Sequence, residues 1–333
     1  MHLSLLTTPE DLAAYQEYLK TAQGASLWQS LEWQGYQGAL GRETRLYGLR
    51  ASSSPFTATA LVVIDKTALG LSTFDIPRGP LGSDQGAKEE LLEAIMEDAK
   101  RERCLSLFFS PPTHYSLQTT HSSNRHEQPE ASLVLNLTLG EDELLKQMHP
   151  KGRYNIGVAR KNGVQVKESQ DIDSFYALLK ETGGRDAFQI RPKNQYEHFL
   201  KDLPGSFLLL AYSPDMPKKA IAGLLGVIWG GKGYYYYGAS AYASRALMAP
   251  YALQSEAIRV CREKGCRTYD LLGISPPEVV GAPRWGAQTH PWEGVTRFKK
   301  QFGGKIETYP PEQEIILRPV VKKILEWKRA LWK

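Results

Sequence analysis

The sequence predicts a mixed α/β protein made of two copies of one domain. Two helix–strand segments, one in each half of the chain, share the same order of residue types, and an apolar run of strand length precedes each of them. The 333 residues leave room for two domains of ordinary size. A repeat of roughly 160 residues is too long for a solenoid, so duplication of an α/β domain is the first interpretation and chance similarity of two segments the alternative.

Each segment has the pattern of an amphipathic helix, a basic C-terminal turn, a buried strand and a Ser-Pro-Pro end. The matching pieces are residues 93–95 and 256–258, 100–105 and 262–267, and 110–112 and 275–277. The apolar strands before them are residues 59–64 and 221–228, and the helices that open the two halves are residues 9–20 and 171–181. Thr8 stands near the cap position of the first of these helices, and Gln170 and Asp171 stand near that of the second.

The junction between the domains is expected between residues 144 and 153. The stretch 114–130 before it is rich in Ser, Thr, His and Gln, as is typical of an exposed loop. Residues 132–137 form a strand candidate that we expect to close the first domain. The first domain therefore spans residues 1–148 in this prediction, and the second spans residues 149–309.

Composition indicates a globular cytosolic protein, with 42% apolar and 23% charged residues. No apolar run reaches the length of a membrane span, and the first residues lack the pattern of a signal peptide. The three cysteines, Cys104, Cys261 and Cys266, form no CxxC pair, so we expect reduced thiols and predict neither a metal nor a cofactor. A net charge of +5 favours anionic partners such as phosphates, tRNA or a membrane surface.

The strongest candidate for chemistry is the stretch 294–304, in which aromatic residues and cations alternate between glycines. A lysine such as Lys299, held on a constrained backbone beside Phe298, would stabilise negative charge that develops on a reacting carbonyl. A basic turn leading into the strand candidate 314–317 is the alternative. We find no Ser-His-Asp order, Walker loop or carboxylate pair, so catalysis would depend on positioning and electrostatics.

Other polar and aromatic residues are candidates for binding. The segment 150–163 reads as a short helix ended by Gly163, with cations that would hold RNA or form a solvated face. Those cations are Lys151, Arg153, Arg160 and Lys161. Gln37 lies one helical turn from Trp33 and would line a cleft. In the strand 234–237, alternate tyrosines should face opposite sides, with two in the core and two available to a groove.

The C-terminal segment 320–333 has apolar residues at helical spacing and lysines over much of the remaining surface. Packing of this helix on the first domain, with a solvated basic back, is one interpretation. The other is a helix that binds an anionic membrane surface, because tryptophans and lysines together suit such an interface.

Several of these segments together resemble the Fem family of peptidoglycan bridge enzymes, non-ribosomal aminoacyltransferases that use aminoacyl-tRNA. The matching residues are Gln29, Ser30, Trp33 and the stretches 76–80, 151–153, 159–164, 237–240, 249–251, 269–273 and 294–304. The resemblance covers most of the chain and implies two tandem GNAT-like (acyl-CoA N-acyltransferase-like) domains. It also implies that the segment 310–333 packs back on the first domain.

The resemblance further implies roles for individual residues. Lys299, with Phe298, would steady the charged tetrahedral state as an amine attacks the ester of aminoacyl-tRNA, and Arg191, with Tyr196 near it, would hold precursor phosphates. The other substrate contacts expected are Gln37, Arg78, Tyr237 and Tyr251, and the tRNA contacts expected are Lys151, Arg153, Arg160 and Lys161. Gln37 stands where some members carry a phosphate-binding lysine, which is compatible with a lipid-linked acceptor. Ser110 stands where many carry an acidic residue, which argues against an aspartate base there.

The expected function is therefore transfer of an amino acid from aminoacyl-tRNA to the stem-peptide amine of a peptidoglycan precursor, either UDP-MurNAc-pentapeptide or a lipid-linked form. We expect a monomer in the cytoplasm, with peripheral contact at the inner face of the plasma membrane as a further possibility. An acyl-CoA-dependent N-acyltransferase on the same fold is an alternative, although the chain lacks the glycine-dense turn that cradles pyrophosphate. A non-catalytic module that binds RNA or cell-wall precursors is the other.

Overall fold

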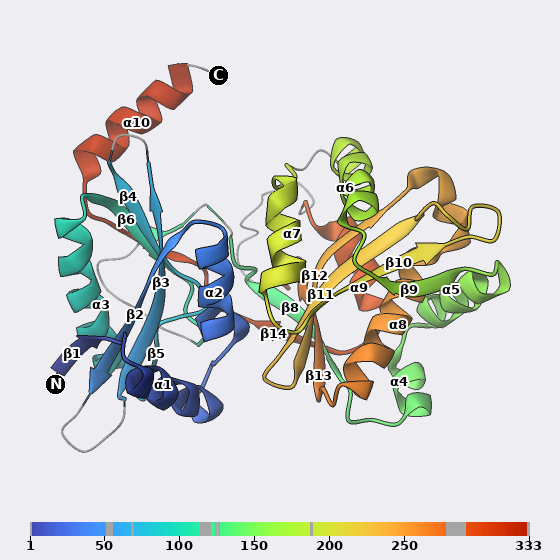
Figure 1. Ribbon diagram of the computed structural model, residues 1–333, viewed down its shortest axis with the longest axis horizontal. Helices are drawn as coiled ribbons and strands as arrows, with labels where there is room; N and C mark the ends of the chain where they lie inside the picture. The colour runs from blue at the N-terminus through green and yellow to red at the C-terminus, as the bar shows by residue number, and fades with distance from the viewer. Residues whose placement is uncertain are drawn as a thin grey trace. The chain divides into compact units, whose positions relative to one another are not determined.

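The computed structural model describes residues 2–50, 56–67, 70–113, 121–123, 125, 127–186, 189–277 and 291–331. The chain divides into two compact units (Figure 1). The first unit is Met1–Glu130 with Tyr309–Lys333, and the second is Ala131–Thr308. Each unit is a mixed sheet with helices on its faces, so the predicted α/β class is confirmed.

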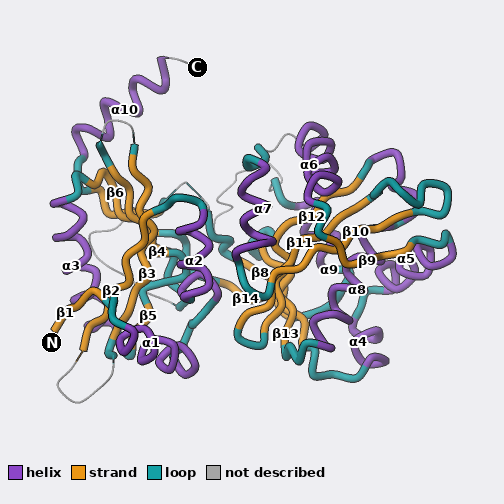
Figure 2. The backbone as a smooth tube through the Cα atoms, viewed as in Figure 1, coloured by secondary structure: helices purple, strands orange, loops and turns teal. Residues whose placement is uncertain are grey.

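In the described part of the first unit, the main sheet has the strand order β1-β2-β3-β4-β6-β15-β7, and β5 pairs with β3. Strands β1 to β6 of this unit are labelled in Figure 2. Its strands are β1 (His2–Leu5), β2 (Glu43–Arg50), β3 (Ala58–Lys66), β4 (Ser72–Ile76), β5 (Leu81–Gly82), β6 (Cys104–Phe109), β7 (His121–Ser122) and β15 (Gln313–Ile316). Its helices are α1 (Pro9–Thr21), the 3-10 helix Leu27–Gln29, α2 (Leu31–Ala39), α3 (Gln85–Arg101) and α10 (Pro319–Leu331).

The second unit has the strand order β14-β8-β13-β12-β11-β10-β9. Its strands are β8 (Ala131–Asn136), β9 (Gln165–Ser169), β10 (Ser206–Tyr212), β11 (Ala222–Trp229), β12 (Lys232–Ser240), β13 (Thr268–Gly273) and β14 (Lys305–Thr308). Its helices are α4 (Glu141–Gln147), α5 (Pro150–Lys161), α6 (Ile172–Asp186), α7 (Lys193–Asp202), the 3-10 helix Tyr242–Leu247, α8 (Ala249–Glu263) and α9 (Glu293–Lys300).

The duplication is confirmed by the order of elements. In the first unit β1 is followed by α1, α2, β2, β3, β4, α3 and β6, and in the second β9 is followed by α6, α7, β10, β11, β12, α8 and β13. In both, the last strand runs parallel to the third strand of the preceding antiparallel meander. Thr8 and Asp171 cap the opening helices as expected, since their side chains accept hydrogen bonds from the backbone N–H groups of Asp11 and Ser174, at 3.2 and 2.9 Å.

The helices cover both faces of the second sheet because β11 is apolar on both sides. Leu224 belongs to the core that includes Leu253 and Ala257 of α8. Its neighbour Gly223 faces the other way, where an added Cβ would lie 2.6 Å from the ring of Phe175 on α6. Helices α8 and α6 therefore pack on opposite faces of the second sheet.

The strand predicted at residues 132–137 was assigned to the wrong domain. It is β8, which pairs with β13 and β14 in the second unit, while β15 from the C-terminal segment takes the equivalent place beside β6 in the first. The boundary thus lies between Glu130 and Ala131 rather than at residue 148. Apolar alternation identifies a strand but not its sheet, because both sheets offer the same open edge beside their parallel strand.

Gln29 connects two stretches of the first unit on which the resemblance was based. Its buried amide accepts a hydrogen bond from the N–H of Leu61 on β3 at 2.8 Å and donates one to the carbonyl of Pro77 at 2.7 Å. A Cβ on Gly79 would approach the Gln29 amide to 2.8 Å, so this position requires glycine. The residues around Gln29 and the stretch 76–80 are therefore packing partners, which explains why they occur together.

Candidate active site

The parallel ladder between β12 and β13 is short. It joins Lys232, Gly233 and Tyr234 to Thr268, Tyr269 and Asp270, whereas the equivalent ladder between β4 and β6 continues to Ile76 and Phe109. Beyond the last pair, Tyr235 on one strand and Gly273 on the other have no partner across this ladder. The end of the ladder is the place where a third element can insert a side chain between two strands.

Lys299 from α9 occupies this place. Its Nζ donates a hydrogen bond to the carbonyl of Gly273 at 2.7 Å and lies 5.6 Å from the centroid of the Tyr235 ring. The residue is 7% exposed, although lysine is rarely buried. Thr296, one turn earlier on α9, fixes the helix to the same segment, because its Oγ1 accepts a hydrogen bond from the N–H of Ser275 at 2.7 Å.

Burial lowers the pKa of Lys299 to about 7, and the nearby carboxylate of Asp270 opposes this shift. Asp270 is itself buried, and burial raises its pKa while Lys232 lowers it. Its carboxylate accepts hydrogen bonds from Ser132 Oγ and from the N–H of Leu272. The site therefore holds one ammonium group in a poorly solvated place, where it interacts more strongly with developing negative charge than it would in water.

Aromatic residues pack around Phe298, which precedes Lys299 on α9. The ring of Phe298 packs edge-to-face against Tyr251 of α8 and against Phe302, with 5.2 Å between centroids in both pairs. The hydroxyl of Tyr251 donates a hydrogen bond to Gln301 at 3.1 Å. Phe298 and Tyr251 line a cavity of about 110 Å³ together with Ser240, Arg245, Met248 and neighbouring residues at the N-terminal end of α8. Phe298 and Tyr251 thus line one cavity, whereas the ammonium of Lys299 contacts Gly273 and Tyr235.

The stretch 294–304 is not the constrained turn that we expected. Residues 293–300 form α9, and the glycine-dependent backbone begins after it, at Gly303 and Gly304, whose φ angles are 80° and 94°. A helix is favoured because Thr296 and Lys299, spaced i and i+3, share one buried face, while Lys300 is exposed. Alternating aromatic and basic residues gave no helical periodicity that would have revealed this.

Arg191 and its neighbours form a second group. The N–H of Arg191 donates a hydrogen bond to the hydroxyl of Tyr196 at 3.1 Å, and the arginine side chain is exposed. Tyr196 is 2% exposed, and its ring contacts Tyr237 at 4.9 Å between centroids. Tyr196 therefore positions the backbone of Arg191 from a buried aromatic cluster, and Tyr237 belongs to the same cluster.

The expected alternation of tyrosines on β12 is interrupted by a β-bulge. Leu225 and Gly226 on β11 face Tyr237 and Tyr235, so Tyr236 is the extra residue. As a result Tyr236 and Tyr237 both contact Phe199 of α7, at 4.8 and 5.6 Å between centroids. The register is regular up to Tyr235, so the bulge leaves the direction of Tyr235 unchanged and reverses that of Tyr237, which sequence periodicity alone would have placed on the same face as Tyr235.

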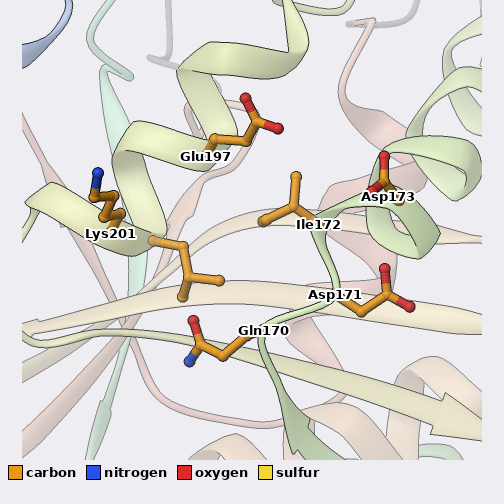
Figure 3. A pocket seen from close by; sticks show the side chains of 7 residues that line it. Gln170, Asp171, Ile172, Asp173, Glu197 and Lys201 are labelled. Atoms are coloured by element: carbon orange, nitrogen blue, oxygen red, sulfur yellow. The ribbon is translucent and has the colours of Figure 1, made fainter.

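A larger cavity, of about 360 Å³, lies between the start of α6 and the helix α7 (Figure 3). Its polar lining is largely acidic, and Lys193 pairs with both Asp173 and Glu197, at 2.5 and 3.1 Å. Asp171 caps α6 through Ser174. These carboxylates stabilise the junction of two helices and would repel a phosphate, so this cavity is a poor candidate for a nucleotide precursor.

The remaining expected substrate residues lie in the first unit and are buried. Gln37 accepts a hydrogen bond from Arg42 at 3.0 Å. Arg78 donates one to the carbonyl of Pro129 at 2.8 Å, and its guanidinium lies 3.6 Å from the centroid of the Tyr309 ring. Both side chains contact residues of the first unit. Arg78 contacts Pro129 and Tyr309, which lie next to the two points where the chain passes between the units.

The cations of α5 differ from one another in their surroundings. Lys151, Arg160 and Lys161 are exposed, whereas Arg153 donates hydrogen bonds to the carbonyls of Leu145 and Met148, at the C-terminal end of α4. The opposite face of α5 packs so closely that a Cβ on Gly152 would lie 2.3 Å from the Gln301 carbonyl oxygen. This contact joins α5 to the segment that follows Lys299.

Sequence reasoning missed several residues of the site. Asp270, Gly273, Tyr235 and Thr296 surround Lys299, and no periodic or motif signal marks Tyr235 or Thr296. Asp270 and Gly273 lie in the stretch 269–273 that carried part of the resemblance, which was a usable signal. Tyr154 on α5 is 70% exposed and was also missed, because an isolated tyrosine in a basic helix normally packs.

Comparison with known proteins agrees with this architecture. The model of the FemAB family matches residues 11–138, 118–213 and 211–327. The lipid II:glycine glycyltransferases of Staphylococcus haemolyticus (strain JCSC1435) and Staphylococcus aureus are both 21% identical to this chain, over 327 and 329 aligned positions that cover 73% of this chain and 76% of each relative.

Two solved structures show the same fold. The crystal structure of FemX superposes with a TM-score of 0.78 at 19% identity, over 98% of this chain and 100% of that one. A tandem GNAT protein from the clavulanic acid biosynthesis pathway superposes with a TM-score of 0.56 at 8% identity, over 94% and 98%. Both units are therefore GNAT-like. Because the family model matches most of its length, the chain belongs to the FemAB family.

Proposed function

We propose that this protein transfers an amino acid from aminoacyl-tRNA to an amine on the stem peptide of a peptidoglycan precursor, and that the precursor is lipid-linked. The observation that carries the proposal is the buried ammonium of Lys299 at the end of the β12–β13 ladder. The names of the relatives, lipid II:glycine glycyltransferases, support the acceptor class. We further propose that the protein acts as a monomer in the cytoplasm.

The chemistry follows from the site. Attack of a neutral amine on the ester carbonyl of aminoacyl-tRNA forms the new C–N bond and places negative charge on the carbonyl oxygen. Collapse of this tetrahedral state breaks the ester bond, and the ribose hydroxyl leaves after gaining the proton that the amine loses. The ammonium of Lys299 stabilises the oxyanion through its charge, and the burial of this residue strengthens that interaction by keeping water away.

The direct test is incubation of the purified protein with a mixture of charged tRNAs and either UDP-MurNAc-pentapeptide or lipid II, followed by mass spectrometry. We expect a precursor whose mass has risen by one amino-acid residue, and a larger yield with lipid II. Ribonuclease treatment of the tRNA should abolish the product. Transfer from acetyl-CoA instead, or no transfer from any charged tRNA, would contradict the proposal.

We propose that the exposed face of α5 contacts the tRNA. Helical spacing places Lys151, Tyr154 and Lys161 on this one face, which offers two cations for phosphates and an aromatic ring for a base. Arg160 is an additional exposed cation, whereas Arg153 is engaged with α4.

Replacement of Lys151 and Lys161 by glutamate should weaken tRNA binding by roughly tenfold or more and make it less dependent on salt, because phosphate contacts release counterions. Filter binding across a salt series measures both quantities. The matched control is the pair Lys218→Glu and Lys219→Glu, which reverses two exposed lysines outside α5. Equal affinity of the two double variants would remove α5 from the tRNA interface.

We also propose that the guanidinium of Arg191 binds precursor phosphate. Arg191→Ala should raise the KM for the precursor by roughly tenfold, and Arg191→Lys should restore it only in part, because a planar fork donates two parallel bonds to phosphate. Tyr196→Phe removes the hydroxyl that holds the Arg191 backbone while keeping the ring, so a smaller rise is expected. Steady-state kinetics with varied precursor give the result, and an unchanged KM in Arg191→Ala would show that the arginine is structural.

A further inference from the structure

The C-terminal helix α10 exposes an apolar stripe. Val320, Ile324 and Trp327 are 69%, 49% and 64% exposed. At 3.6 residues per turn these three side chains lie within about 60° of one another around the helix axis. Among the side chains that the structure describes, Val321 and Leu325 are half-buried, as expected for packing on the first domain, whereas these three are exposed. Ala330, Leu331 and Trp332, which belong to the same predicted stripe, lie outside the described side chains.

The stripe is displayed by a helix that is anchored at one end. The N–H groups of Leu317 and Arg318 both donate to the carbonyl of Leu105 on β6, at 2.9 and 3.2 Å. Lys322 forms an ion pair with the buried Glu314 of β15 at 2.5 Å. The rest of α10 extends beyond the end of the sheet of the first unit (Figure 1). Its first turn thus fixes the direction in which the stripe faces.

The lysines on both sides of the stripe favour an anionic lipid surface over a second copy of the helix as its partner. Lys323 and Lys328 are exposed and lie about 40° beyond the two edges of the stripe. Glu326 is on another face, directed toward Lys322 at 3.9 Å. A second copy of the helix would bring lysines against lysines, with no carboxylate beside the stripe to pair with them. An anionic lipid surface accepts the apolar side chains and pairs with both lysines.

We propose that α10 binds the surface of an anionic phospholipid membrane, with Val320, Ile324 and Trp327 inserted among the lipids and Lys323 and Lys328 at the headgroups. Among the residues that the structure describes, no helix combines the length and apolar character that crossing a bilayer requires. The contact is therefore peripheral. The purpose of this contact rests on the proposed function, because membrane binding would hold the enzyme where a lipid-linked acceptor resides.

Vesicle flotation tests the contact. The protein should float with vesicles of equal parts phosphatidylcholine and phosphatidylglycerol at low salt, and much less with phosphatidylcholine alone or at high salt. The triple variant Val320→Gln, Ile324→Gln, Trp327→Gln should stay at the bottom. The double variant Lys323→Glu, Lys328→Glu should bind roughly thirtyfold more weakly or worse, which corresponds to about 2 kcal/mol for the two lysines.

Matched controls keep the test specific. Ile306→Gln removes an apolar side chain that is 41% exposed in β14, and the pair Lys218→Glu, Lys219→Glu reverses two lysines of the second unit. Both controls should float like the parent protein, and circular dichroism should show all variants folded. The proposal is overturned if the parent protein ignores anionic vesicles or if the triple variant still floats. It is also overturned if sedimentation shows a dimer that the triple variant converts to a monomer.

The flotation result can be interpreted independently of whether the proposed transfer reaction occurs. Flotation needs no substrate, so absence of transfer in the parent protein would leave the membrane contact standing. Conversely, the triple variant should keep its turnover with the water-soluble UDP-MurNAc-pentapeptide and lose it mainly with lipid II in vesicles. Equal loss on both acceptors would show that the stripe serves the folded structure and not the membrane.

Discussion

Lys299→Met should lower kcat by roughly a hundredfold or more while leaving the protein folded. The ammonium is the cation that the structure places at the end of the β12–β13 ladder, and loss of one such oxyanion stabiliser typically costs a factor of this size. Single-turnover transfer from aminoacyl-tRNA is the appropriate measurement. The control is Lys300→Met, which removes the exposed neighbouring lysine and should have little effect. Near-normal turnover in Lys299→Met would remove this residue from the mechanism.

The same substitution should change stability in the opposite direction. The pKa of Lys299 is lowered from 10.5 to about 7 in the folded protein, so the unfolded chain binds more protons between these values. The free energy of unfolding of the parent protein therefore increases as pH rises through this range. At pH 7, near the lower end of the range, Lys299 destabilises the folded protein. Lys299→Met should be more stable than the parent protein at pH 7, and this difference should fall by a few kcal/mol toward pH 10, because one pKa unit corresponds to about 1.4 kcal/mol.

Activity should also depend on the protonation of Lys299. Because an acceptor amine must be neutral to attack, its own ionisation obscures a simple pH profile. The ratio of kcat/KM for the parent protein to that for Lys299→Arg cancels the amine, since arginine stays protonated. This ratio should be constant below pH 7 and fall about tenfold per pH unit above it. A constant ratio up to pH 9 would show that the charge on Lys299 is not used.

Glu312→Ala should destabilise the first unit by about 2 to 3 kcal/mol. Glu312 is 3% exposed and pairs with Arg125 through two hydrogen bonds, of 3.1 and 3.2 Å. It also accepts one from Ser110 at 3.4 Å. The substitution would leave the half-buried guanidinium of Arg125 with Asp75 as its remaining carboxylate partner. Burial raises the pKa of Asp75 to about 7, although Arg125 lowers it.

The measurement for Glu312→Ala is thermal unfolding, read separately for the two units by hydrogen exchange. Amides of β6 and β15 should lose protection while those of β10 and β11 keep theirs, because the side-chain hydrogen bonds of Glu312 are to Ser110 and Arg125 of the first unit. Glu326→Ala, which removes an exposed carboxylate from α10, is the control. Equal protection in the two variants would mean that the C-terminal segment contributes little to the first unit.

Local signals sufficed for much of the fold. Helix caps at Thr8 and Asp171, the apolar runs of β3 and β11, and the paired helices α3 and α8 were all readable, because each depends on residues close in sequence. The repetition of these elements was enough to infer two copies of one domain. The functional importance of Lys299 remains a prediction, which came from the pattern of the stretch 294–304 and from the resemblance, and its burial is consistent with it.

The sequence by itself therefore determined the class of fold, the duplication and the residues that deserve mutation. Only the tertiary structure decided that β8 and β15 exchange places between the two units, that a bulge at Tyr236 turns Tyr237 away from the face of Tyr235, and that Val320, Ile324 and Trp327 face outward. The physical reason is common to all three. Period and propensity state that a residue is apolar or that a strand exists, but the partner that covers it is chosen by contacts among segments far apart in the chain.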